Sequence, residues 1–74
     1  MTLNEIGRYD YNDYVVIILE SIDNYDGYFH YWVTLEGYGT INTVYGVPER
    51  FVADTVWEYV KDYIDELIDD FNGV

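Results

Sequence analysis

Carboxylate side chains recur at three- and four-residue spacing along the C-terminal third of this sequence. On an α-helix, that spacing places side chains on one face. Neighbouring carboxylates accept ion pairs and charge-assisted hydrogen bonds from lysine and arginine, so the chemistry they offer is the binding of a cationic partner. The residues predicted to form this face are Asp54, Glu58, Asp62, Asp65, Glu66 and Asp69, with Asp70 at its flank.

This acidic face works against folding. It holds five like-charge pairs four residues apart, which together cost about 1–2.5 kcal/mol. A chain of 74 residues has a stability of only roughly 4–11 kcal/mol. On a straight helix, positions 54–70 span about 24 Å, and the spacing of their carboxylates approaches the ~3.4 Å between phosphates of one DNA strand. We therefore expect the face to mimic nucleic acid and bind a cationic groove. The alternative is a solvated face kept for solubility.

Ten tyrosines suggest a second surface. On the predicted strand 28–36, alternation points Tyr28, His30 and Trp32 outward, with Val16 and Ile18 beside them. Tyrosine and tryptophan are typical anchors of protein interfaces, so Tyr28 and Trp32 are candidate partner-binding residues. The alternatives are that these rings are half-buried strand residues, or that a self-complementary patch forms a homodimer.

The elements that position these residues follow from residue patterns. Runs of β-branched and aromatic residues predict three strands at 14–19, 28–36 and 40–45. Turn residues at 21–27 and 37–39 separate them, and such short connections favour an antiparallel meander. Positions 1–8 are weakly patterned, although Thr2 and Glu5 have the spacing of a capping box.

A helical pattern follows Pro48, which suits a first helical position. It runs to Phe71, with Asn72-Gly73 as the C-cap. The apolar positions fall on one broad arc, which comprises Val52, Val56, Tyr59, Val60, Tyr63, Ile64, Leu67 and Phe71.

The predicted fold is α+β, a two-layer βββα arrangement in a single domain over 1–74. A three-stranded antiparallel meander carries one long C-terminal helix packed on one face. Strand alternation gives the expected inward residues, which are Val15, Ile17 and Leu19, then Phe29, Tyr31, Val33 and Leu35, and finally Ile41.

Composition excludes several classes of function. Without cysteine there is no disulfide or thiolate metal site. The segment 23–27 resembles a calcium loop, but Ile22 and Val33 stand where that motif needs acids. With one serine, one histidine and no evident pocket, we expect no enzyme, metal or cofactor. A net charge of −12 disfavours direct binding to nucleic acid or anionic membranes. The first residues lack the features of a secretory signal, so we expect a cytoplasmic protein.

In size, charge, lack of cysteine and predicted strand-strand-strand-helix order, the chain resembles small acidic inhibitors encoded by phages, namely anti-CRISPR proteins and DNA-mimic antirestriction proteins. The resemblance implies a non-enzymatic inhibitor that blocks the cationic DNA- or RNA-binding surface of a host defence nuclease, such as a CRISPR effector. Two alternatives remain open. One is an immunity protein or antitoxin for a basic nuclease toxin, and the other is a homodimeric interaction module that uses the aromatic sheet face.

Overall fold

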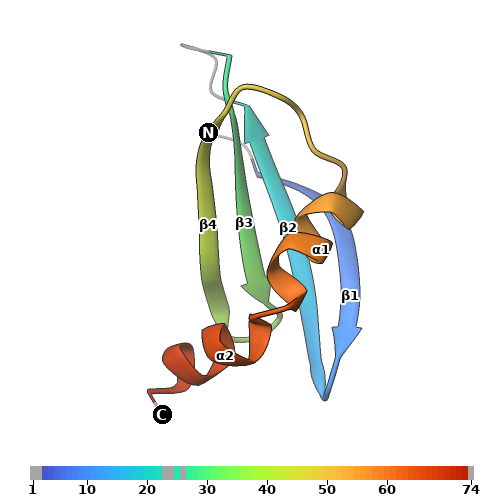
Figure 1. Ribbon diagram of the computed structural model, residues 1–74, viewed down its shortest axis with the longest axis vertical. Coiled ribbons are helices and arrows are strands. Elements are labelled where there is room, and N and C mark those ends of the chain that lie inside the picture. The colour runs from blue at the N-terminus through green and yellow to red at the C-terminus, as the bar shows by residue number, and fades with distance from the viewer. Residues whose placement is uncertain (1–2, 23–24, 26, 74) are drawn as a thin grey trace.

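The computed structural model of the chain describes residues 3–22, 25 and 27–73. It consists of a four-stranded antiparallel sheet followed by two short helices (Figure 1). The strands are ordered β1-β2-β3-β4, so each pairs with its neighbour in the chain. The elements are β1 (Asn4–Tyr11), β2 (Tyr14–Ile22), β3 (Phe29–Leu35), β4 (Gly39–Val47), α1 (Ala53–Lys61) and α2 (Ile64–Asn72).

The prediction of a three-stranded meander with one long helix is wrong in two respects: the sheet has a fourth strand, β1, and the helix is divided into two. Strand β1 includes positions 4–8 of the weakly patterned segment, and Glu5, a residue with capping-box spacing, lies in the strand rather than in a helical turn. Thr2 lies outside the described residues. A tight turn joins β1 to β2, and Asn12 within it has a φ of 43°, a left-handed value that asparagine tolerates better than most residues. The predicted turn at 21–27 falls partly outside the described residues.

The inward side chains of β3 are those predicted. Tyr31, Val33 and Leu35 are buried, and Phe29 packs at the edge of the core. Ile41 on β4 also packs against the core, as expected.

The predicted orientation of β2 is inverted. Val16 pairs with Leu35 and Ile18 with Val33, so these two residues face the core, while Val15, Ile17 and Leu19 lie on the opposite face. A shift of one residue reverses every side chain of a strand. Because residues 14–19 are uninterruptedly apolar, their pattern does not say which face is buried.

The single predicted helix is two helices, separated at Tyr63, where φ is −130°. Their buried residues are Val56, Val60, Ile64 and Ile68, spaced four apart. On a straight helix each such step turns the side chain by about 40°, so the first and last would point about 120° apart. The break redirects α2, and all four side chains reach the core. Of the predicted apolar arc, Val52, Tyr59 and Phe71 are exposed instead.

The ends of the helical region also differ from expectation. Pro48 lies in the connection after β4, and α1 begins only at Ala53. The predicted C-cap is confirmed, because Gly73 ends α2 with a left-handed φ of 75°.

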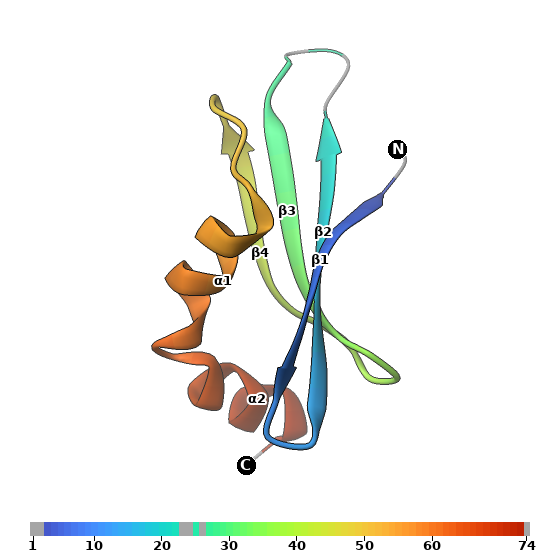
Figure 2. The ribbon, with the colours of Figure 1, turned by 90° about the vertical axis from the view of Figure 1, so that its right-hand side faces the viewer.

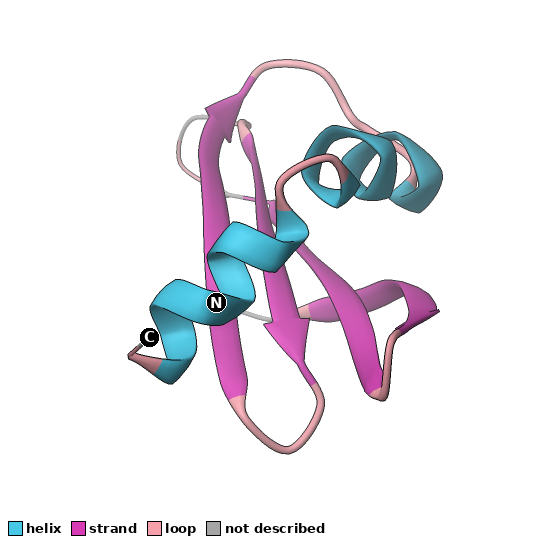
Figure 3. Ribbon diagram, turned by 60° about the horizontal axis from the view of Figure 1, so that its bottom comes forward, coloured by secondary structure: helices cyan, strands magenta, loops and turns pink. Residues whose placement is uncertain are grey.

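Both helices lie on the same side of the sheet (Figure 2), and their axes run in different directions (Figure 3). Helix α1 lies over β1 and β2, whereas α2 lies against β4. The contact with β1 is close at Gly7, where an added Cβ would lie 2.4 Å from the Cβ of Ala53. Within the described ranges, neither helix is long and apolar enough to cross a membrane.

Candidate functional site

The carboxylates predicted to form the acidic face are all exposed on α1, α2 and the break between them. We call this set the acidic helix surface. It comprises Asp54, Glu58, Asp62, Asp65, Glu66, Asp69 and Asp70. Because the helix breaks at Tyr63, the surface is bent rather than straight. The expected match to the phosphate spacing of one DNA strand depended on a straight helix, so it does not hold.

Two members of the surface accept hydrogen bonds from β1. The Tyr9 hydroxyl donates to Asp54 Oδ1 at 2.5 Å, and the Tyr11 hydroxyl donates to Asp65 Oδ1 at 2.8 Å. Burial and the bond to Asp54 raise the pKa of Tyr9 to about 12. The bond to Asp65 is the main cause that raises the pKa of Tyr11. Sequence reasoning missed these partners, although the alternation in Tyr9-Asp10-Tyr11 is typical of a strand with both phenols on one face.

The cations of the protein are mostly engaged away from this surface. Arg8 pairs with Glu5 on β1 and with Glu36 in the turn after β3, and Arg50 pairs with Glu20. Lys61 binds Glu58 at 2.9 Å, which raises the Lys61 pKa. In the part of the chain that the structure describes, no ion pair reaches the four carboxylates of α2, so α2 is the more negative half of the surface.

The break also changes the electrostatics of the helix ends. Asp65 and Glu66 lie in the first turn of α2, where the positive end of the helix dipole stabilises carboxylates. On one continuous helix, Glu66 would have stood near the negative end. Asp69 and Asp70 do stand there, and the last turn of α2 has no basic residue.

A buried network fixes the segment that leads into α1. Glu20 is 1% exposed and accepts hydrogen bonds from the Tyr31 hydroxyl and from Arg50 Nη2, each at 2.9 Å. The Phe51 amide donates to the Tyr31 oxygen at 2.7 Å. Burial raises the pKa of Tyr31. Because Phe51 and Arg50 are tied to the sheet in this way, the start of α1 is held over it.

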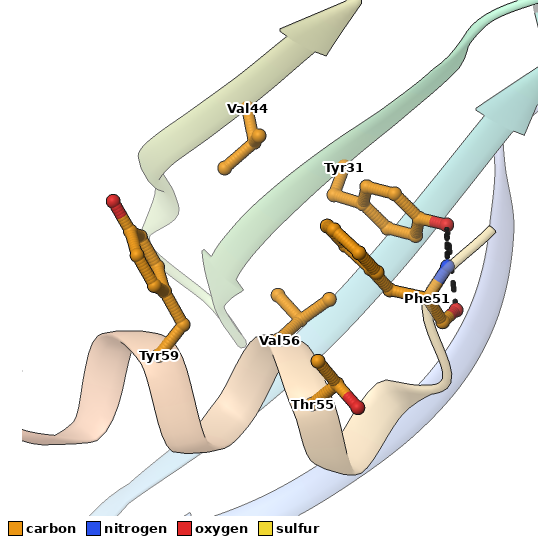
Figure 4. A pocket seen from close by; sticks show the side chains of 6 residues that line it. All are labelled: Tyr31, Val44, Phe51, Thr55, Val56 and Tyr59. Carbon is orange, nitrogen blue, oxygen red and sulfur yellow. Dashed lines mark hydrogen bonds between the residues drawn. The ribbon is translucent and has the colours of Figure 1, made fainter. Parts of the chain in front are cut away.

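An apolar pocket of about 290 Å³ opens between α1 and β4 (Figure 4). It exists because α1 lies over β1 and β2 while α2 turns toward β4, so α1 and β4 diverge. Sequence reasoning expected no pocket. No glycine or proline marks the helix break that creates it. The residues that line the pocket are Tyr31, Val44, Phe51, Thr55, Val56 and Tyr59.

The predicted aromatic patch lies on the sheet face that the helices leave uncovered. Trp32 is half-buried there, and His30 is buried, with its Nδ1 accepting a hydrogen bond from the Gly46 amide at 3.0 Å. Tyr45, which was not predicted, packs edge-on against both rings. Tyr28 is exposed just before β3.

The neighbours of this patch differ from expectation. Val16 and Ile18, placed beside it in the prediction, are core residues, and the inverted β2 puts Val15, Ile17 and Leu19 on this face instead. Ser21 lies opposite His30 on β2, and its buried hydroxyl has no hydrogen-bond partner among the described residues.

Metal ligands do not gather in the described ranges, since no group of three His, Asp or Glu side chains there could hold an ion. The segment 23–27, which resembles a calcium loop in sequence, lies partly outside those ranges. The chain matches no protein-family model, no curated protein and no solved structure.

Proposed function

We propose that this protein is a non-enzymatic inhibitor that presents its acidic helix surface to the cationic nucleic-acid-binding surface of a host defence nuclease, such as a CRISPR effector. The observation that carries the proposal is the exposure of seven carboxylates over residues 54–70. Among the described residues, a single cation, Lys61, forms an ion pair with one of them. A partner lined with lysine and arginine would supply the missing positive charge.

The physical basis is complementarity of charge. A negative surface of this kind accelerates encounter with a positive one and suppresses binding to other acidic molecules. The bend at Tyr63 turns the axis of α2 away from that of α1 (Figure 3), so the acidic helix surface does not follow one straight line. A curved channel therefore suits the acidic helix surface better than a straight groove does.

The test is competition with DNA. Duplex binding by a purified RNA-guided nuclease and by a restriction enzyme is measured by fluorescence anisotropy, with the protein added at 50 and 200 mM salt. We expect competition that weakens at the higher salt. The variant D62N/E66Q/D69N should lose about tenfold or more in inhibition. Asp54 and Asp65 are left intact because they bind Tyr9 and Tyr11.

A charge-matched control separates this surface from net charge alone. The variant D10N/D13N/E49Q removes the same number of charges from exposed positions outside the helices and should inhibit like the unaltered protein. Equal loss in both variants would show that only total charge matters. Absence of competition with either nuclease would contradict the assignment to defence nucleases.

A further inference from the structure

We infer that the pocket between α1 and β4 receives one apolar side chain of the cationic partner, so that the partner's binding segment is an aliphatic or aromatic anchor flanked by lysine or arginine. This inference rests on the proposed function and names the recognition element that charge alone lacks. Figure 4 shows the pocket and its lining side chains.

The size and walls of the pocket fit a side chain. Clefts that hold drug-sized ligands measure about 300–1,000 Å³, so a space of about 290 Å³ lies at the small end. Val44, Val56 and the rings of Phe51 and Tyr31 form its walls. The Tyr31 hydroxyl is already hydrogen-bonded to Phe51 and Glu20, so Tyr31 contributes its aromatic ring to the wall of the pocket rather than its hydroxyl.

The rim of the pocket leaves apolar surface in water. Tyr59, which lines the pocket, is 66% exposed. The Tyr59 ring packs edge-on against Tyr63 with centroids 6.0 Å apart, which holds it in place beside the opening. An anchored, exposed tyrosine next to an apolar pocket is typical of the centre of a protein interface.

Charge decides which occupant fits. Asp62, the C-cap of α1, lies three residues after the rim residue Tyr59 and is exposed, so the two are neighbours on the helix surface. Glu58 lies three residues after Thr55, but Lys61 already pairs with it. Lysine or arginine beside the anchor would therefore meet Asp62. A second copy of this chain would bring another net charge of −12, and an anionic lipid would also be repelled.

The experiment uses three synthetic heptapeptides of alternating lysine and arginine that differ only in the central residue, which is phenylalanine, leucine or glycine. Binding to the full chain is measured by calorimetry at low salt. We expect the phenylalanine and leucine peptides to bind about tenfold or more tightly than the glycine peptide, because only they bury apolar surface. The variant T55W, which fills the pocket from its exposed rim, should abolish this preference. The nearly isosteric T55V should retain it.

The outcomes separate this inference from the proposed function. Equal affinity for all three peptides, or a preference that survives in T55W with an unchanged circular dichroism spectrum, would overturn the pocket assignment. The variant D62N/E66Q/D69N should weaken all three peptides alike, and unchanged binding there would contradict the proposed function instead. A dimer in sedimentation that T55W abolishes would assign the pocket to a second copy and overturn the inference.

Discussion

At the scale of single residues, the hydroxyl of Tyr9 links the acidic helix surface to the stability of the fold. Its bond to Asp54 requires a protonated phenol, and its pKa is raised to about 12 from the ordinary value of about 10. Folding therefore favours the neutral form. The resulting stability is fully present below pH 10 and is lost as pH rises through about 12.

This predicts an alkaline loss of stability that depends on Tyr9. The variant Y9F should be less stable than the unaltered protein at pH 8, by about 0.5–1.5 kcal/mol for the lost hydrogen bond. The difference should shrink between pH 10 and 12. Urea unfolding followed by tryptophan fluorescence at several pH values measures it. The control is Y45F, since Tyr45 is exposed on the opposite sheet face. A constant difference across the whole pH range would contradict the role of this bond.

Exposure of the helical carboxylates could be read from the sequence, but their partners could not. Helical spacing alone placed the acids opposite the apolar residues, and all of them are exposed. The bonds from Tyr9 and Tyr11, however, join residues 45 and 54 positions apart. Such contacts depend on where β1 lies, and no local pattern encodes that.

At the scale of elements, Gly7 decides how closely α1 approaches β1. The Cβ of an alanine there would lie 2.4 Å from the Cβ of Ala53, a distance that forces the helix or strand to move. We predict that G7A destabilises the fold by about 1–3 kcal/mol, as overpacking does. Ala53→Gly removes the opposing methyl group, so the double variant G7A/A53G should recover most of the loss.

Chemical denaturation of the two single variants and the double variant tests this. Helix propensity predicts that A53G alone costs up to about 1 kcal/mol. The double variant should nevertheless be more stable than G7A. If it were less stable than both single variants, the close approach would not be the cause.

The elements themselves were predictable where local patterns are strong. The three expected strands overlap β2, β3 and β4, because β-branched runs bounded by turn residues are a local signal. Strand β1 was missed because Gly7 and charged residues dilute its alternation. The helix break was missed because it depends on tertiary packing. Val56 and Ile68 are buried in the same core, and the local sequence pattern does not show this.

At the scale of the whole molecule, charge is distributed unevenly. The sheet and its connections use Arg8 and Arg50 to neutralise carboxylates, while α2 has four acids and no base. The like-charge pair 62/66 spans Tyr63, where the helix is interrupted. The pairs 54/58, 58/62, 65/69 and 66/70 lie along single helices and their caps. The fold therefore reduces the repulsion expected for a straight helix without removing it.

Because repulsion remains, neutralising part of the acidic helix surface should stabilise the protein. The variant D62N/E66Q/D69N relieves three uninterrupted pairs and removes the charge of Asp69 from the negative end of the α2 dipole, but it gives up the favourable position of Glu66 in the first turn of α2. The net gain is about 1 kcal/mol, or about 4–8 °C in Tm for a chain of this size. The control D10N/D13N/E49Q has the same net charge and should gain less.

Raising salt from 10 to 150 mM shortens the screening length from about 30 to 8 Å, so it should raise the Tm of the unaltered protein more than that of the helix variant. Equal Tm gains in both variants would show that the repulsion belongs to the total charge rather than to the two helices. A lower Tm in the helix variant would mean that these carboxylates stabilise the fold, and the argument that they exist for a partner would then fail.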